Sequence, residues 1–210
     1  MGSRYTFSDF DAMYRKLHTD SVAKKLRSAV VGIAGLGGLG SNAAAALARA
    51  GIGTLILVDY DRVELSNLNR QYYTVDDIGV LKTAALSGIL KRINPFVRLI
   101  IRNERITRKN CLALFREAAV VVEAVDDPAA KMVVIETILS GSRRLPVVAA
   151  SGMGGFGKNG EIRERKLGDL TVIGDEKTAV ADGVPLLAPR VGIVAHMQAN
   201  AVLELLLAER

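Results

Sequence analysis

The chain has 210 residues, of which half are apolar and 24% are charged, a balance typical of globular rather than disordered proteins. At this length about 70% of the surface of the unfolded chain is buried on folding, so no metal ion or disulfide is needed to hold a core. The uncharged apolar stretches are shorter than the roughly 20 residues of a membrane span, and no signal-like leader is recognisable. The single cysteine, Cys111, excludes an internal disulfide and a cysteine-based structural zinc site. We therefore expect a soluble, cytoplasmic protein without a membrane partner.

The net charge of +6 is unevenly distributed along the chain. Residues 81–110 hold eight Lys and Arg side chains and one acidic side chain, Glu104. A nucleic-acid-binding face combines such charge with exposed aromatic residues or a recognised motif, and this stretch holds one aromatic residue, Phe96. A solvated basic face that favours an acidic partner is the simpler interpretation, so we expect no nucleic-acid binding.

Short β-branched runs alternate with helical patterns, which predicts an α/β domain around a mostly parallel sheet. An N-terminal helical segment, residues 1–27, comes first. Buried strands are predicted at residues 29–34, 54–58, 97–101, 119–123 and 146–150. Between them, helices are predicted over residues 41–50, 80–93 and 107–118 and from Pro128, whose missing N–H costs nothing at the first helical position.

The pattern changes after Ser151, where glycines mark several turns. Short antiparallel strands are predicted at 161–166 and 170–173, followed by a loop over 174–185 and a long apolar helix over 189–208. The predicted fold is therefore a Rossmann-like, doubly wound α/β fold. Its mostly parallel sheet carries a short antiparallel C-terminal extension and a long C-terminal helix.

A glycine-rich turn follows the first strand and opens a helix, in the sequence Gly35-Leu-Gly37-Gly38-Leu-Gly40. The first glycine permits the tight turn, the second lets the backbone approach a phosphate, and the third lets helix and strand pack closely. Free N–H groups and the helix dipole attract the anion. Asp59 lies 19 residues after Gly40, at the end of the second strand, where its carboxylate can accept from ribose hydroxyls. These residues predict a nucleotide site.

An NAD-dependent oxidoreductase is the usual owner of this pattern, but hydride transfer usually requires a proton donor beside the nicotinamide. The chain has two histidines: His18 precedes the nucleotide domain, and His196 lies in the apolar last helix, where we expect a packing role. The loop after Asp59 is crowded with hydrogen-bonding and cationic groups, which suits a triphosphate.

At this loop the chain resembles the family of adenylating enzymes that activate ubiquitin-like sulfur carriers, which includes ThiF, MoeB and the adenylation domains of ubiquitin-activating enzymes. The resemblance rests on the glycine turn, on Val58-Asp-Tyr-Asp-Arg-Val-Glu-Leu-Ser-Asn-Leu-Asn-Arg-Gln71, and on three later segments. These are Ile78-Gly-Val-Leu-Lys82 with Ala85, Ile93-Asn-Pro95, and Val125-Asp126. The match covers roughly residues 28–155 and is most similar to a compact ThiF, which makes 28–210 an adenylation domain.

The resemblance implies that a carrier's C-terminal carboxylate attacks the α-phosphate of ATP. An α-carboxyl has a pKa of about 3.3–3.7, so this nucleophile needs no general base. It also implies roles for the site residues: Asp59 binds ribose, Asn67 and Arg70 hold phosphates, Lys82 steadies the α-phosphate, Asp126 holds Mg²⁺, and Asp61 and Gln71 shape the same wall. Surface salt bridges for Arg70 and Lys82, and helix capping for Asp126, are the alternatives.

The chain departs from the family at several points. It lacks the paired Cys-x-x-Cys motifs that hold zinc, and residues 174–185 lack the cysteine that takes over the activated acyl group in many relatives. We expect Cys111 to pack in the core, and we therefore expect no enzyme thioester. An arginine that reaches a neighbouring subunit's ATP site has two candidates, Arg15 and Arg27. Asp127, where relatives carry Asn, is expected to cap the next helix.

Apolar residues at helical spacing in the last helix indicate either burial against the sheet or a two-fold homodimer. The stripe consists of Val191, Val194, Ala195, Gln198, Ala201 and Leu205, widened by Leu203, Leu206 and Leu207. The predicted function is adenylation of a ThiS-like carrier that ends in Gly-Gly. Activation of another ubiquitin-like carrier (MoaD-like), an NAD-binding oxidoreductase and a non-catalytic carrier-binding module are the alternatives.

Overall fold

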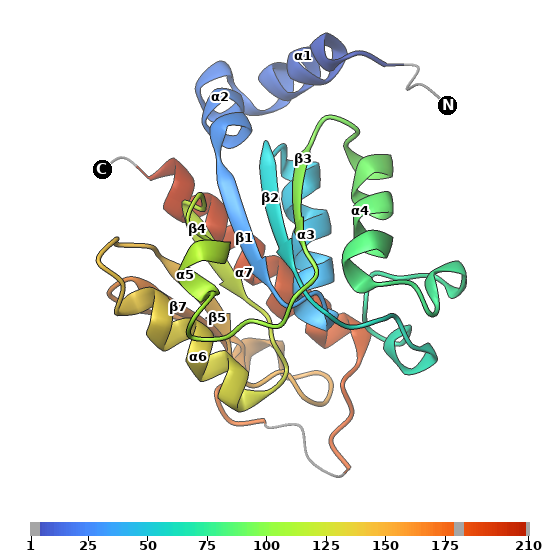
Figure 1. The fold of residues 1–210 in the computed structure, drawn as a ribbon, viewed down its shortest axis with the longest axis vertical. Coiled ribbons are helices and arrows are strands. Elements are labelled where there is room, and N and C mark those ends of the chain that lie inside the picture. The colour runs from blue at the N-terminus through green and yellow to red at the C-terminus, as the bar shows by residue number, and fades with distance from the viewer. Residues whose placement is uncertain (1–4, 179–182, 209–210) are drawn as a thin grey trace.

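The computed structural model describes residues 5–178 and 183–208, which form seven strands in one sheet and the helices that cover it (Figure 1). The strands are β1 (Val30–Ala34), β2 (Thr54–Val58), β3 (Arg98–Arg102), β4 (Val120–Glu123), β5 (Val147–Ala150), β6 (Arg163–Leu167) and β7 (Leu170–Gly174). The helices are α1 (Phe7–His18), α2 (Asp20–Ser28), α3 (Gly38–Ala50), α4 (Lys82–Ile93), α5 (Cys111–Leu114), α6 (Pro128–Leu139) and α7 (Ala188–Leu207). Short 3₁₀ turns cover Leu65–Asn67, Val75–Asp77 and Asn159–Glu161.

The sheet has the strand order β3-β2-β1-β4-β5-β7-β6, and all neighbouring strands are parallel except β6 and β7. Its central strands are buried on both faces, which explains their continuous apolar sequences. Helices α3, α4 and α7 contribute to the core on one face, and α5 and α6 to the core on the other. The Rossmann-like fold with its long C-terminal helix is therefore confirmed.

The order of strands reverses between β1 and β4. The chain runs outward from β1 through β2 to β3 and then returns to the other side of β1 at β4. In open α/β sheets a ligand crevice lies at such a reversal, outside the carboxyl ends of the strands. The loops after β1, β2 and β4 meet there.

The antiparallel extension differs in detail from the prediction. β6 and β7 form the predicted antiparallel pair, but β7 also pairs in parallel with β5 and thereby continues the main sheet. Only the edge strand β6, whose residues are all exposed, is antiparallel to its neighbour. The predicted loop 174–185 includes residues 179–182, which lie outside the described residues.

The helix predicted over 107–118 is wrong, since only Cys111–Leu114 is α-helical. The Asn110 side chain accepts hydrogen bonds from the backbone N–H and the hydroxyl of Thr107, at 2.7 and 3.0 Å, and holds a turn there instead. After Leu114 the chain bends so that Phe115 and Ala118 enter the core beside β4. Local side-chain bonding and burial therefore override the helical pattern.

The N-terminal segment forms two helices at the end of the sheet where β1 begins (Figure 1). The far end of the sheet, where the strands end, lies beside the beginning of α6. Helix α7 packs along α3 and against β4 and β5, and buries Val191, Val194, Ala195, Gln198 and Ala201 within the molecule. No helix in the described part of the chain has the length and apolarity required to cross a bilayer.

Candidate nucleotide-binding site

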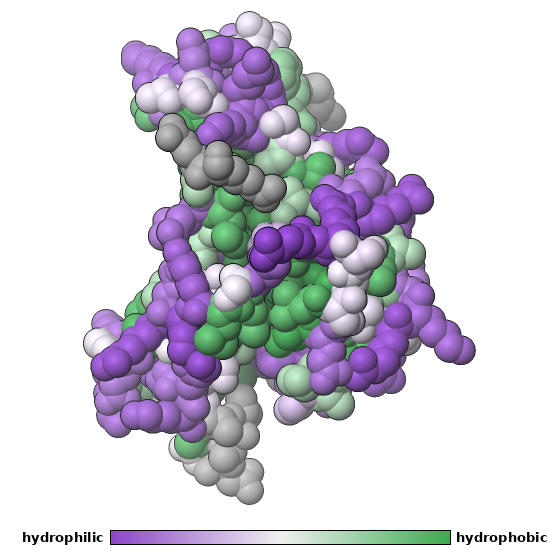
Figure 2. Space-filling view, turned by 90° about the vertical axis from the view of Figure 1, so that its left-hand side faces the viewer, coloured by the Kyte–Doolittle hydropathy of each residue, from purple (hydrophilic) through white to green (hydrophobic). Residues whose placement is uncertain are grey.

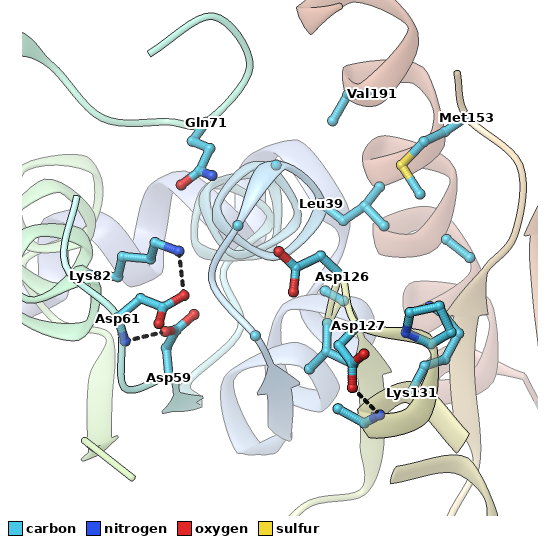
Figure 3. Close-up of a pocket in the computed structure, with 18 of the residues that line it drawn as sticks. Leu39, Asp59, Asp61, Gln71, Lys82, Asp126, Asp127, Lys131, Met153 and Val191 are labelled. Atoms are coloured by element: carbon cyan, nitrogen blue, oxygen red, sulfur yellow. Dashed lines mark hydrogen bonds and ion pairs between the residues drawn. The ribbon is translucent and has the colours of Figure 1, made fainter. Parts of the chain in front are cut away.

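A cavity of about 520 Å³ lies at the carboxyl ends of the parallel strands. Ligand pockets in proteins usually have volumes of about 300–1,000 Å³, so this cavity can hold a small-molecule ligand. Figure 3 shows Asp59, Asp61 and Lys82 on one side of this cavity, and an apolar group across from them that adjoins two further charged residues, Asp127 and Lys131. The lining comes from the glycine turn, the ends of β2 and β4, the loop after β5 and the start of α7.

The glycine turn needs its glycines for different reasons. Gly35 has φ +88°, and a Cβ atom there would lie 2.8 Å from the carbonyl oxygen of Ala124. A Cβ atom on Gly40 would lie 1.9 Å from the carbonyl oxygen of Gly35. At Gly37 the only atom within 4 Å of such a Cβ is Nε2 of Gln71, at 3.8 Å, so the backbone there is open to the cavity. Gly37 caps α3 without a side-chain hydrogen bond, which leaves N–H groups of the first turn available to an anion.

Three side chains hold this turn in place. Ser41 donates to the carbonyl oxygen of Gly37 at 2.6 Å and accepts from the backbone N–H of Tyr72 at 3.0 Å. Asn42 donates to the carbonyl oxygens of Gly38 and Arg70, at 2.6 and 3.0 Å. Buried Tyr73 donates to the carbonyl oxygen of Leu36 at 2.8 Å. The Ser-Asn pair after Gly40 therefore ties the turn to the loop that carries Arg70.

Asp59, at the end of β2, accepts hydrogen bonds from the backbone N–H groups of Leu36 and Asp61 at 2.7 and 2.8 Å. Burial raises the pKa of Asp59, although these N–H groups and Lys82 act in the opposite direction. Asp61 forms an ion pair with the buried Lys82, whose Nζ lies 3.0 Å from Oδ2 of Asp61. All three side chains line the cavity, on one side of it (Figure 3).

Arg70 and Gln71 also line the cavity, whereas Asn67 does not. The guanidinium of Arg70 donates to the carbonyl oxygen of Ser66 and to Oδ1 of Asn69, at 3.1 and 2.8 Å. Oε1 of Gln71 is buried and has no hydrogen-bond partner. Asn67 accepts from the backbone N–H of Glu64 at 3.1 Å, as the third residue of the capping box in which Glu64 is the N-cap of the 3₁₀ turn. The polar loop thus brings Arg70 and Gln71 to the cavity, whereas the Asn67 side chain stabilises the 3₁₀ turn within the loop.

The loop after β4 carries two adjacent acids with different surroundings. Asp126 lines the centre of the cavity (Figure 3). Asp127 accepts from the backbone N–H of Ala130 at 2.7 Å and caps α6, as predicted, with Pro128 in the first turn of the helix. Beneath them, fully buried Glu123 forms an ion pair with Lys131, which lines the cavity. Burial raises the pKa of Glu123, and Lys131 opposes this.

An apolar wall lies across the cavity from Asp59, Asp61 and Lys82, next to Asp127 and Lys131. It is formed by Leu39, Met153 and Val191, which Figure 3 shows together, and by Ala150 and Leu186. None of the described residues that line the cavity is a histidine. The cavity thus joins a charged half to an apolar half, with Asp126 between them (Figure 3).

Other predicted residues lie away from the cavity. His196 is exposed on α7, with Nδ1 2.8 Å from the carbonyl oxygen of Gly192, so the predicted packing role is wrong. Cys111 is fully buried, as predicted, and burial raises its pKa to about 11. Arg15 pairs with Asp11 and Asp20, and Arg27 pairs with Asp11. Their helices lie at the opposite end of the sheet (Figure 1).

Some residues that shape this site carry no recognisable signal in the sequence. Lys131 lacks a motif of its own, and its buried partner Glu123 lies in an otherwise apolar strand. Tyr73 lies in a loop, and no motif indicates that its hydroxyl contacts the glycine turn. A glutamate that ends a buried apolar strand is the one clue that the sequence offered, because an unpaired buried charge is costly and implies a cation nearby.

Comparison with known proteins supports the earlier resemblance. Ubiquitin-like modifier-activating enzyme 5 of Culex quinquefasciatus is 31% identical over 207 residues, which cover 88% of this chain and 52% of that protein. The adenylyltransferase and sulfurtransferase uba4 of Aspergillus niger is 40% identical over 131 residues, 61% of this chain and 27% of that protein. The chain thus spans about half the length of the first of these relatives, and less of the second.

Solved structures share the fold. The tRNA N6-threonylcarbamoyladenosine dehydratase TcdA of E. coli matches with a TM-score of 0.85 and 22% identity over 95% of both chains. Its complex with ATP matches with a TM-score of 0.80 and 22% identity over 94% of both chains. The family model for ThiF matches residues 11–210. This chain therefore belongs to the ThiF family.

Proposed function

We propose that the chain is an ATP-dependent adenylyltransferase that activates the C-terminal glycine carboxylate of a small ubiquitin-like sulfur carrier, of the ThiS-like kind. The observation that carries this proposal is the two-part cavity, in which a charged half built on the glycine turn adjoins an apolar half without a histidine. Adenylation by an ionised carboxylate needs positive charge and alignment rather than a general base.

The reaction forms a bond between a carboxylate oxygen and the α-phosphorus of ATP. The bond between that phosphorus and the bridging oxygen breaks, and pyrophosphate leaves with the electron pair. In the proposed arrangement the backbone around Gly37 binds phosphate, Asp59 accepts from the ribose, and Arg70 and Lys82 supply the positive charge. Asp61 holds Lys82 in position. Gln71 offers a buried, unpartnered oxygen at the same wall.

Mg²⁺ is part of the proposal, and Asp126 is the residue proposed to hold it. The described residues include no cluster of three or more His, Cys, Asp or Glu side chains suited to a metal. Magnesium, however, is usually bound by one or two carboxylates together with substrate phosphates, so a single carboxylate beside the phosphate site fits it. Bound there, the ion would neutralise phosphate charge. The proposal includes no zinc.

The name of ubiquitin-like modifier-activating enzyme 5 supports a ubiquitin-like carrier as the partner, and the name of uba4 supports adenylyl transfer and sulfur chemistry. We propose that the acyl group stays on the adenylate without passing to the enzyme, because Cys111 is buried in the core and its raised pKa disfavours the thiolate.

A homodimer is also proposed. Leu203, Leu206 and Leu207 on α7 remain partly buried within one chain, and Figure 2 shows apolar surface below the N-terminal helices. Arg15 and Arg27 stay the candidates for an arginine donated to a neighbouring site.

The test is ATP–pyrophosphate exchange with Mg²⁺, against a panel of Gly-Gly-ending carriers of the ThiS-like, MoaD-like and other ubiquitin-like kinds. We expect exchange with a ThiS-like carrier, and loss of exchange when its final glycine is removed. Exchange with a different carrier would change the proposed substrate but support the proposed adenylation reaction. Binding of NADH instead of ATP would contradict the proposal and favour an oxidoreductase, and carrier binding without exchange would indicate a binding module.

A tRNA substrate is a second candidate, favoured by one observation. An E. coli structure that shares this fold is that of a dehydratase named for a tRNA nucleoside. The sequence itself predicts no nucleic-acid binding. Total tRNA is therefore added to the exchange panel, and exchange with tRNA alone would favour this candidate.

A further inference from the structure

A buried ion pair lies behind the apolar half of the cavity. Nη2 of Arg190, in the first turn of α7, lies 2.6 Å from Oδ2 of Asp175, directly after β7. The side chains of Arg190 and Asp175 are 3% and 1% exposed. Neither residue lines the cavity.

Asp175 organises the chain on its own side of the pair. Its carboxylate accepts hydrogen bonds from the backbone N–H groups of Lys177 and Thr178, at 2.9 and 2.8 Å, and from the Thr178 hydroxyl at 2.7 Å. Burial acts against its ionisation, but the bonds from Thr178, Lys177 and Arg190 together hold the pKa of Asp175 well below its usual range. The Asp175 carboxylate is therefore ionised at neutral pH.

The same two residues hold the loop after β5. Arg190 donates to the carbonyl oxygen of Gly157, and the backbone N–H of Asp175 donates to the carbonyl oxygen of Gly152 at 3.1 Å. A Cβ atom on Gly152 would lie 2.0 Å from Oδ1 of Asp175. Three segments that are distant in sequence, namely the loop after β5, the stretch after β7 and the start of α7, thus meet at one ion pair.

These three segments supply much of the cavity wall opposite the charged half. Their lining residues are Ser151, Gly152, Met153, Thr178 and Val191. A buried ion pair contributes little net stability compared with apolar side chains of similar volume, because removing two charges from water is costly. Such a pair can instead select one arrangement of the segments it joins, and here that arrangement defines the apolar half.

We infer that Asp175 and Arg190 are positioning residues for the carboxylate-bearing substrate: they fix the wall of the apolar half in which that substrate lies. The inference rests on the proposed adenylation. The pair acts on one substrate only, because the charged half that binds the nucleotide is built on the glycine turn, Asp59 and Lys82, and the pair forms no hydrogen bond with them. Loss of the pair should therefore raise KM for the carrier and leave KM for ATP unchanged.

The experiment measures steady-state pyrophosphate exchange with the carrier that the wild-type protein accepts. Arg190→Met should raise KM for the carrier at least tenfold and leave KM for ATP within about twofold. Arg190→Lys, which keeps the cation, should raise KM for the carrier less than Arg190→Met does. Arg165→Met is the matched control, since Arg165 pairs with Glu176 next to Asp175 but lies on the surface; both of its KM values should stay unchanged.

Breaking a buried pair is strongly destabilising, so circular dichroism is used to establish that each variant is folded. If Arg190→Met does not fold, Thr178→Val, which removes one hydrogen bond to Asp175, should still raise the carrier KM severalfold. An unchanged carrier KM in the folded variants, or an equal rise in both KM values, would overturn the inference and leave the proposed function intact. A wild-type protein that shows no exchange with any carrier would contradict the proposed function itself, and the inference with it.

Discussion

Asp126 and Asp127 are neighbours in sequence but differ in their proposed tasks. Both line the cavity, but Asp126 is proposed to hold Mg²⁺, whereas the Asp127 carboxylate caps α6. We predict that Asp126→Ala lowers the exchange rate at least a hundredfold without changing the thermal midpoint by more than a few degrees. Asp127→Ala should lose about 1 kcal/mol of stability with its cap and keep most of the exchange activity.

Exchange assays and thermal unfolding of the two variants are the measurements. The pair separates chemistry from capping, because the variants differ by one position in the same loop. Near-normal exchange in folded Asp126→Ala would remove that residue from the mechanism.

At the scale of elements, the turn between β1 and α3 requires the backbone at Gly35 to pack directly against the backbone at Gly40. A Cβ atom on Gly40 would lie 1.9 Å from the carbonyl oxygen of Gly35, so Gly40→Ala should destabilise the fold by about 3 kcal/mol and weaken ATP binding. Gly88 in α4 is exposed and has no atom within 4 Å of such a Cβ. Gly88→Ala should therefore stabilise the protein by roughly 0.5–1 kcal/mol.

Denaturant unfolding and ATP titration test this contrast. Equal stability of the two alanine variants would show that the turn relaxes around a side chain, contrary to the packing argument.

The stretch after β7 gives a pH prediction through Asp175. Its pKa in the folded chain lies below the unfolded value of about 3.9, so the stability it contributes is fully present above that value and is lost as the pH falls. Asp175→Asn should lose about 3 kcal/mol at pH 7, and the deficit should shrink as the pH falls below about 4.

Urea unfolding of the wild type and Asp175→Asn between pH 7 and pH 3 checks this. A deficit that stays constant over this range would mean that the carboxylate charge is not what stabilises the folded state.

Elements of the sheet were predictable where burial alone determines them. The predicted bounds of β1 to β5 agree with the structure to within one residue, because strands that are covered on both faces require continuous apolar runs. The helix over 107–118 was not, since a side-chain bond at Asn110 and the burial of Phe115 depend on local and tertiary contacts that no periodicity encodes.

The site was predictable where a motif carried it. The glycine turn, Asp59, Asp61, Arg70, Gln71, Lys82 and Asp126 do come together at one cavity. The family resemblance implies that Asn67 holds phosphate, but its side-chain oxygen accepts a hydrogen bond within its own turn. The Asp175–Arg190 pair joins residues fifteen positions apart with no motif between them, and only the fold brings them together.

At the scale of the whole molecule, the proposed homodimer forms through the last turns of α7. Sedimentation should give a dimer at micromolar concentration, and Leu206→Glu should shift it to monomer by placing a charge in an apolar interface. Leu139→Glu, at an exposed apolar position on α6, should leave the dimer intact. A monomeric wild-type protein would contradict the proposal.

The central claim is that the chain forms an acyl-adenylate and does not carry the acyl group itself. Intact-protein mass spectrometry of the enzyme and a Gly-Gly-ending carrier, after incubation with ATP and Mg²⁺, tests it most directly. We predict that the carrier gains one adenylyl group, that the enzyme mass is unchanged, and that Cys111→Ser gives the same result. An unmodified carrier, or a carrier bound to the enzyme through a thioester, would contradict the account.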